Sequence, residues 1–269
     1  MENIIEVKNL NKNFKGFKAV DDVSFSVGRG QMFAFLGPNG AGKTTLIKML
    51  TTLLHPTSGT ILINSKNPVK EQDEARRAFS IVFQDPSLDD KLTAYENMEF
   101  HAILYGEKKD TRKERIENLL KFMDLWDRRN DLVEHFSGGM KRGGMKRRLE
   151  IARGLIHYPK ILFLDEPTIG LDIQTRRYIW EYIEELSEKE KMTVFFTTHY
   201  IEEAEQIADC VTIIDHGKII ASGTPKQLEE KTNTSNLADA FIKLTGENIR
   251  EEEAGNVERM RSFQRMHRR

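Results

Sequence analysis

The sequence has a single cysteine, Cys210, so a disulfide within one chain is excluded. No run of about 18 apolar residues occurs, which argues against a membrane-spanning helix. The first residues lack a basic stretch followed by a long apolar run, so we expect no secretory signal. The formal net charge is -1, which provides no overall field that favours nucleic acid. We therefore expect a cytosolic protein that does not bind nucleic acid and that reaches a membrane only through a partner.

Short apolar runs alternate with helical periodicities along most of the chain. The segments Met32–Leu36, Ile161–Leu164 and Thr193–Thr197 are apolar or β-branched throughout, as is typical of strands buried on both faces. Ile4–Val7 and Ala19–Val27 also have the composition of strands. Because helical stretches separate the later strands, we predict an α/β fold with a mostly parallel sheet.

One stretch of the chain is poor in strand signals. Between Asp85 and about Phe136, charges interleave with apolar residues such as Ile116 and Leu120 at helical spacing. This pattern predicts a helical subdomain inserted into the α/β part. We expect the following division: residues 1–84 and 161–230 as the core, 85–160 as the helical subdomain, and 231–269 as a short, partly disordered C-terminal extension.

The segment GPNGAGKT follows an apolar strand and precedes a helical periodicity, and it matches the pattern G-x-x-x-x-G-K-[ST]. Glycines let backbone N–H groups turn toward phosphate oxygens, and the helix N-terminus adds the positive end of its dipole. Lys43 would reach the β- and γ-phosphates, and the Thr44 hydroxyl would ligate Mg²⁺. An ordinary glycine-rich turn is the alternative. The predicted ATP-binding residues are Gly37, Pro38, Asn39, Gly40, Ala41, Gly42, Lys43, Thr44 and Thr45.

A second apolar strand, ILFLDE, ends in two carboxylates. Asp165 could hold Mg²⁺, and Glu166 could act as the general base that polarises the attacking water. Taken alone, the same pattern also describes a strand that ends in a solvated acidic turn. Together with the phosphate-binding loop, it favours hydrolysis of ATP.

These motifs, and others in the same order, resemble the nucleotide-binding subunit of an ABC transporter over about residues 4–225. Gln84 in IVFQDPSL resembles the glutamine loop of that family, and the resemblance implies that it contacts Mg²⁺ and relays to a membrane partner. His199 in FFTTHY resembles the switch histidine that senses the γ-phosphate. Phe14 occupies the position of the aromatic residue that stacks on adenine, with Phe17 as its neighbouring competitor.

The resemblance also implies a shared site between two chains. Asp172 falls in a segment, Gly-Leu-Asp, that resembles the D-loop. In this family the signature motif binds the ATP held by a facing subunit, so we expect a dimer, most simply a homodimer. The signature-like residues are Ser137, Gly138 and Gly139.

The five-residue unit GGMKR occurs twice in succession, at 138–142 and 143–147. The resemblance implies a shorter spacing between Ser137 and Asp165, by one such unit. Five extra helical residues would add about 7.5 Å and rotate the helix start by a net ~140°. Either the helix stays anchored and Arg142 replaces the serine, or the extra residues loop out. We expect ATP binding to persist and hydrolysis to be impaired, whereas an outward bulge would preserve function.

Several segments, among them AVDDVSFSV and TTHYIEEAE, resemble the ABC-2 type branch that exports drugs and antibiotics. The resemblance implies a peripheral ATPase on the cytoplasmic face of the cell membrane, with a second ATP-binding subunit, a separate transmembrane permease, ATP and Mg²⁺. Two alternatives remain open. One is a soluble ATPase of translation or DNA repair, and the other is a regulatory nucleotide-binding module without catalysis.

Overall fold

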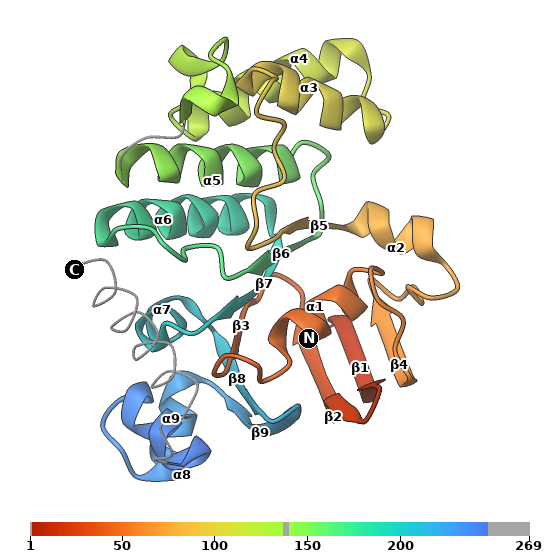
Figure 1. The fold of residues 1–269 in the computed structure, drawn as a ribbon, viewed down its shortest axis with the longest axis vertical. Coiled ribbons are helices and arrows are strands. Elements are labelled where there is room, and N and C mark those ends of the chain that lie inside the picture. Colours follow the sequence, from red (N-terminus) through yellow and green to blue (C-terminus); the bar gives the residue numbers. More distant parts are fainter. Residues whose placement is uncertain (1, 137–139, 247–269) are drawn as a thin grey trace, which may run out of the picture.

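The computed structural model describes residues 2–136 and 140–246, which form two sheets surrounded by helices (Figure 1). The smaller sheet is antiparallel, in the order β2-β1-β4. The larger sheet has the order β5-β6-β7-β3-β8-β9, and its neighbours are parallel except for β9, which runs antiparallel to β8. The strands are β1 (Asn3–Phe14), β2 (Phe17–Gly28), β3 (Met32–Leu36), β4 (Ser58–Ile63), β5 (Phe79–Val82), β6 (Ile161–Asp165), β7 (Thr193–Thr198), β8 (Cys210–Asp215) and β9 (Lys218–Gly223).

Helices cover the larger sheet and form the part of the molecule drawn at the top of Figure 1. Those of the described ranges are α1 (Lys43–Leu50), α2 (Gln72–Ala78), α3 (Ala94–Leu104), α4 (Lys109–Phe122), α5 (Met140–Gly154), α6 (Ile173–Glu190), α7 (Ile201–Ile207), α8 (Pro225–Thr232) and α9 (Leu237–Thr245). Short 3-10 turns, η1 (Trp126–Arg128) and η2 (Val133–Phe136), lead from α4 toward α5. Residues 247–269, most of the predicted C-terminal extension, lie outside the described ranges.

The larger sheet is buried on both faces. All five residues of β3 are buried, and so are all those of β6 and β7. One face packs against the smaller sheet and α1, where the rings of Phe25, Phe33 and Phe195 lie 5.4–6.0 Å apart. The other face packs against the remaining helices. This double cover explains why the strands are apolar throughout rather than alternating, and it confirms the predicted α/β fold with N-terminal antiparallel strands.

The helices α3, α4 and α5 fall within the stretch predicted to be helical. The start of α3 is fixed by reciprocal hydrogen bonds, since Glu96 N donates to Thr93 Oγ1 (3.1 Å) and Thr93 N donates to the Glu96 carboxylate (2.8 Å). Below α3 and α4, α5 lies between them and α6 (Figure 1). The α5 helix therefore connects the helical part to the sheet.

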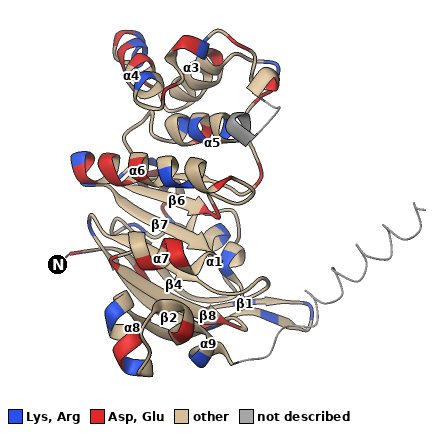
Figure 2. Ribbon diagram, turned by 90° about the vertical axis from the view of Figure 1, so that its left-hand side faces the viewer, with Lys and Arg blue, Asp and Glu red and all other residues tan. Residues whose placement is uncertain are grey.

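Lys or Arg residues and Asp or Glu residues occur together along α4, α6 and α8 (Figure 2), consistent with the net charge of -1. Within residues 2–136 and 140–246, every helix is too short or too polar to cross a bilayer.

The parallel strands β3, β6 and β7 are neighbours and end at the same edge of the sheet. The residues that follow them directly are Gly37, Glu166 and His199. Ligands of open parallel sheets bind outside the carboxyl ends of the strands. The fold thus gathers three of the sequence motifs at one place.

Candidate functional site

The loop of residues 37–42 connects β3 to α1 and depends on its glycines. A Cβ on Gly37 would lie 2.4 Å from the carbonyl oxygen of Ile214, and one on Gly42 would lie 2.4 Å from that of Ala19. Gly40 has a φ of +77°, in the left-handed region. Gly42 is the N-cap of α1 and has no side chain that could bind the N–H groups of the first turn. This geometry fits an anion such as phosphate.

Lys43 places a cation at the centre of the loop. Its side chain is only 5% exposed, and Nζ donates to the carbonyl oxygens of Gly37 (2.6 Å) and Pro38 (3.2 Å). The same ammonium lies 3.4 Å from the Glu166 carboxylate. A phosphate in the loop would therefore meet a buried positive charge that already lies beside the acidic pair.

Asp165 and Thr44 face each other across the end of β6. The Thr44 hydroxyl lies 3.4 Å from Asp165 Oδ1, and the same oxygen accepts a 2.7 Å hydrogen bond from Thr197 Oγ1. Burial raises the pKa of Asp165, against the lowering effect of the two threonine hydroxyls. A hydroxyl and a carboxylate are the hard oxygen ligands that Mg²⁺ prefers, and a cation here would offset the burial of this carboxyl.

Glu166 and His199 form a hydrogen-bonded pair, with His199 Nδ1 3.0 Å from Glu166 Oε2. Burial acts to raise the pKa of Glu166, but the hydrogen bond from His199 and the charge of Lys43 outweigh it, and the pKa is below its usual value. Glu166 also has a φ of 49°, unusual for a residue with a side chain. The carboxylate is thus ionised and held in place, as a general base requires.

Several of these residues line one hollow of about 540 Å³, whereas Gly37, Asp165 and Thr197 are not part of its lining. It brings Gln84, Glu166 and His199, which are far apart in the sequence, to the phosphate-binding loop. The rest of its lining consists of Phe17, Ala19, Asn39, Gly40, Ala41, Gly42, Lys43, Thr44, Thr45 and Ile169.

The two candidate aromatic residues differ in position. Phe17 lines the hollow and is 61% exposed, whereas Phe14 is not part of its lining. Phe14 is 47% exposed at the end of β1, with the ammonium of Lys12 5.2 Å from its ring centre. Of the two, Phe17 has the better position to stack on a base bound beside the loop.

Asp172, another predicted residue, does not line this hollow. The signature-like residues Ser137, Gly138 and Gly139 fall outside the described residues. Asp172 caps α6, where its carboxylate accepts hydrogen bonds from Thr175 N (3.0 Å) and Thr175 Oγ1 (2.7 Å). Asp172 therefore stabilises the start of α6 within this chain.

Sequence reasoning missed Thr197. It is fully buried on β7, and its hydroxyl binds both the Asp165 carboxylate (2.7 Å) and the backbone N–H of Glu166 (3.1 Å). The sequence has two threonines, Thr197 and Thr198, between an apolar run and His199. This pair did not indicate a site residue, because β-branched residues are common in strands.

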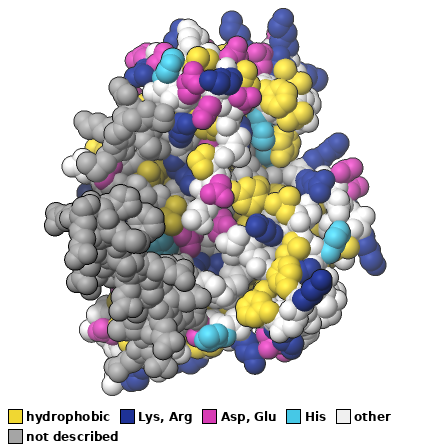
Figure 3. Space-filling view, in the orientation of Figure 1, with side chains coloured by type: hydrophobic (Ala, Val, Ile, Leu, Met, Phe, Trp, Pro, Cys, Tyr) yellow, Lys and Arg dark blue, Asp and Glu magenta, His cyan; other side chains and the backbone are white. Residues whose placement is uncertain are grey.

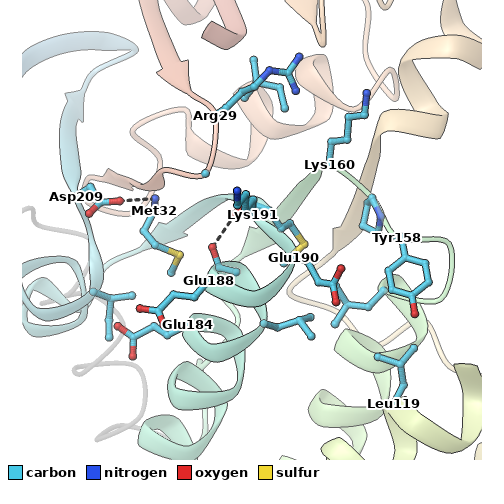
Figure 4. Close-up of a pocket in the computed structure, with 18 residues that line it drawn as sticks. Arg29, Met32, Leu119, Tyr158, Lys160, Glu184, Glu188, Glu190, Lys191 and Asp209 are labelled. Carbon is cyan, nitrogen blue, oxygen red and sulfur yellow. Dashed lines mark hydrogen bonds between the residues drawn. The ribbon is translucent and has the colours of Figure 1, made fainter. Parts of the chain in front are cut away.

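A second cavity, of about 790 Å³, lies elsewhere (Figure 4). It opens near the amino ends of β6 and β7, at the opposite edge of the sheet from the phosphate-binding loop. Its lining carries charges of both signs, among them Arg29, Lys160, Lys191, Glu184 and Asp209. None of the predicted site residues lines it.

Comparisons with known proteins agree with this geometry. Residues 20–169 match the sequence pattern of the family described as ABC transporter. The chain is 38% identical to the daunorubicin/doxorubicin resistance ATP-binding protein DrrA of Streptomyces peucetius, over 93% of this chain and 76% of that protein. It is also 38% identical to the linearmycin resistance ATP-binding protein LnrL of Bacillus subtilis, over 92% of this chain and 76% of that protein. A solved dimeric ATP-binding cassette in a post-hydrolysis state, bound to ADP and Pi, is 28% identical with a TM-score of 0.73, covering 82% of this chain and 98% of its own.

Proposed function

The chain belongs to the ABC transporter family, and from this premise we propose that it hydrolyses ATP to drive export through a separate membrane subunit. The observation that carries the proposal is the convergence of Lys43, Thr44, Gln84, Glu166 and His199 on one hollow at the carboxyl ends of the parallel strands. A binding module without catalysis would not need an ionised, buried carboxylate held by a histidine beside a phosphate-binding loop.

The residues support the following chemistry. The loop N–H groups and Lys43 bind the phosphates of ATP. The Lys43 ammonium then contacts phosphate oxygens in place of the carbonyl oxygens of Gly37 and Pro38. Glu166 accepts a proton from water as the water oxygen bonds to the γ-phosphorus; the bond from the γ-phosphorus to its bridging oxygen breaks, and ADP and phosphate leave. His199 holds the Glu166 carboxylate and lies where it would contact the γ-phosphate.

Mg²⁺ fits the oxygen-rich corner beside the loop. Thr44 and Asp165 would hold it, with Gln84 as a further ligand from the same hollow. Bound there, Mg²⁺ would supply positive charge against the negative charge that develops on the phosphate oxygens.

We further propose that the working unit is a homodimer in which the signature-like segment of one copy completes the site of the other. The similarity to a dimeric cassette that holds ADP and Pi supports this arrangement. The hollow is open on one side, and the described residues of a single copy supply only the half built from the loop and the acidic pair.

The membrane subunit has a candidate contact surface on α3. Phe100, Ile103 and Leu104 are 53–66% exposed, although they are large and apolar. Figure 3 shows this hydrophobic group at the upper right, over α3. We propose that the permease covers it and so holds the chain at the cytoplasmic face of the membrane.

The relatives suggest the class of cargo. Two of them are named for resistance to daunorubicin, doxorubicin or linearmycin. By this similarity we propose that the cargo is a drug- or antibiotic-like amphiphile. The soluble alternatives, translation or DNA repair, find no support in these relatives.

The dimer can be tested with the full chain in solution. Glu166→Gln keeps the shape of the side chain and removes the base, so it should trap ATP between two copies. Sedimentation should show a monomer without nucleotide and a dimer with Mg²⁺ and ATP. Adding Lys43→Ala should abolish both ATP binding and the dimer. A Glu166→Gln protein that binds ATP but stays monomeric would contradict the two-copy site.

A further inference from the structure

The segment that carries Gln84 is held by three charged side chains of α5. Residues 83–87 follow β5 without regular structure of their own. Arg147, Glu150 and Arg153 recur at every third position of α5 and therefore share one side of the helix. All three contact this segment.

Arg147 binds the backbone carbonyl oxygens of two successive residues, Phe83 and Gln84. Its Nη1 donates to the carbonyl oxygen of Phe83 (2.5 Å), and its Nη2 donates to that of Gln84 (2.8 Å). A guanidinium presents two donors in a fixed fork, so the two bonds together fix position and orientation. The side chain of Gln84 is left to face the nucleotide hollow.

Glu150 and Arg153 hold Ser87, three residues further on. The Glu150 carboxylate accepts a 2.6 Å hydrogen bond from Ser87 N, and Arg153 Nη1 donates to Ser87 O (2.7 Å). The Ser87 hydroxyl also contacts both charged groups. The segment is therefore fixed at both ends by the same helix.

The pair of Arg147 and Glu150 is buried, which separates it from ordinary surface pairs. The side chains of Arg147 and Glu150 are 8% and 2% exposed and pair at 3.1 Å. Removing one partner would leave the other charge buried and unpaired, which is strongly unfavourable. Neighbouring cations of α5 point elsewhere: Arg148 Nη1 donates to Met123 O (2.8 Å), and Lys146 pairs with Asp90 at 2.7 Å.

The geometry points to Arg147, supported by Glu150, as a positioning residue for Gln84. We propose that α5 and residues 83–87 move as one unit, so that the position of α5 sets where Gln84 meets the nucleotide. The turnover part of this inference rests on the proposed function of Gln84. Arg147 belongs to the second GGMKR copy, residues 143–147. The second copy therefore supplies this contact, and the first copy precedes it in the sequence.

Arg147→Lys tests the inference, with Arg148→Lys as the matched control on the next position of the helix. Lysine keeps the charge but cannot donate to two carbonyls in a fixed fork. In the complex with its membrane subunit, Arg147→Lys should lower kcat on the order of tenfold or more, because misplacing a group by about 1 Å is enough. The KM for ATP should stay unchanged, since Lys43 and the loop are untouched. The Mg²⁺ concentration for half-maximal rate should rise. Arg148→Lys should change none of these.

Amide hydrogen exchange of the full chain gives a second readout that does not depend on turnover. Exchange at Ser87 should be faster in Arg147→Lys than in Arg148→Lys. If Arg147→Lys does not fold, Glu150→Gln, which has nearly the same shape, should give the same faster exchange. The inference would be overturned if Ser87 exchanged equally fast in Arg147→Lys and Arg148→Lys. It would also be overturned if Ser87 exchanged equally fast in Glu150→Gln and the wild type.

Gln84→Ala separates this inference from the proposed function. If that variant keeps the wild-type rate, the role given to Gln84 in hydrolysis fails. The exchange comparison still decides the contact itself: faster exchange in Arg147→Lys supports it, and equal exchange refutes it.

Discussion

At the scale of single residues, the acidic end of β6 is organised by hydroxyls and a strained backbone. Glu166 adopts a left-handed conformation, and its N–H is held by Thr197, which also binds Asp165. A non-glycine residue in this region is costly and persists where surrounding contacts fix it, often at functional sites. One buried threonine thus binds the carboxylate of Asp165 and the backbone of Glu166.

Thr197→Val should reveal this role, with Thr197→Ser as the control that keeps the hydroxyl. Valine removes a hydrogen-bond donor from the buried Asp165 carboxylate, whereas the Glu166 N–H keeps the backbone carbonyl of Thr197 (3.1 Å). We expect a cost of about 1–3 kcal/mol in the free energy of unfolding. We also expect Mg²⁺ to bind more weakly, so that the Mg²⁺ concentration for half-maximal ATP hydrolysis rises. Denaturant unfolding and Mg²⁺ titrations of the rate measure the two effects. Equal behaviour of the valine and serine variants would refute the role.

The loop and the acidic pair were predictable residue by residue, because each is a contiguous pattern whose flanks identify it. Thr197 was not, since a threonine in a strand has no distinguishing neighbours. The choice between Phe14 and Phe17 also needed coordinates, because both flank the same turn and only one lines the hollow.

At the scale of elements, α5 decides how the duplicated GGMKR is accommodated. The helix is continuous from Met140 to Gly154, so its described part contains no looped-out insert. Leu149, Ala152 and Ile156 at its C-terminal side are buried, and Arg147 holds the Gln84 segment. These contacts favour the anchored arrangement, in which the first copy extends the helix at its start.

Deleting residues 138–142 should therefore restore the usual helix start without disturbing the contact made by Arg147. The described helix would lose its first three residues, 140–142, which are about 4.5 Å of its length. We expect ATP affinity to stay the same and the hydrolysis rate of the assembled complex to rise. A rate that does not rise would count against the hypothesis that the duplication impairs turnover.

A pair of half-buried histidines, His101 of α3 and His157 just after α5, lies where these two helices meet. Burial lowers the pKa of His101 from 6.5 to about 4 and also lowers that of His157, and the ring of Tyr105 stacks on His157 at 3.8 Å. His101 Nε2 and His157 Nδ1 have no hydrogen-bond partner among the described residues. Both imidazoles are therefore neutral in the folded state at pH 7.

This burial makes stability depend on pH. Below pH 6.5 the unfolded chain binds protons that the folded chain excludes, so the free energy of unfolding should fall as the pH is lowered toward 4. His101→Phe should reduce this loss by roughly 2 kcal/mol, because the phenyl ring has nothing to protonate. Urea unfolding at pH 7 and pH 5 measures the difference. The exposed His216→Gln should retain the wild-type loss, and an equal loss in His101→Phe would contradict the explanation.

At the scale of the whole molecule, strand order brings the site together. Apolar runs separated by helices predicted a parallel sheet, but the order β5-β6-β7-β3-β8-β9 depends on pairings between distant segments. Local periodicity carries no information on such pairings. For the same reason, the sequence showed α5 as an amphipathic helix but not that its charged residues would hold the Gln84 segment.

The account as a whole assigns the chain to ATP-driven export, with Glu166 as the base of the reaction. The most direct test is phosphate release from ATP by the complex of this chain with its membrane subunit, compared with the same complex carrying Glu166→Gln. We expect Mg²⁺-dependent release that falls by about 10²–10⁴-fold in the variant while ATP still binds. Equal release by the two complexes would contradict the assignment.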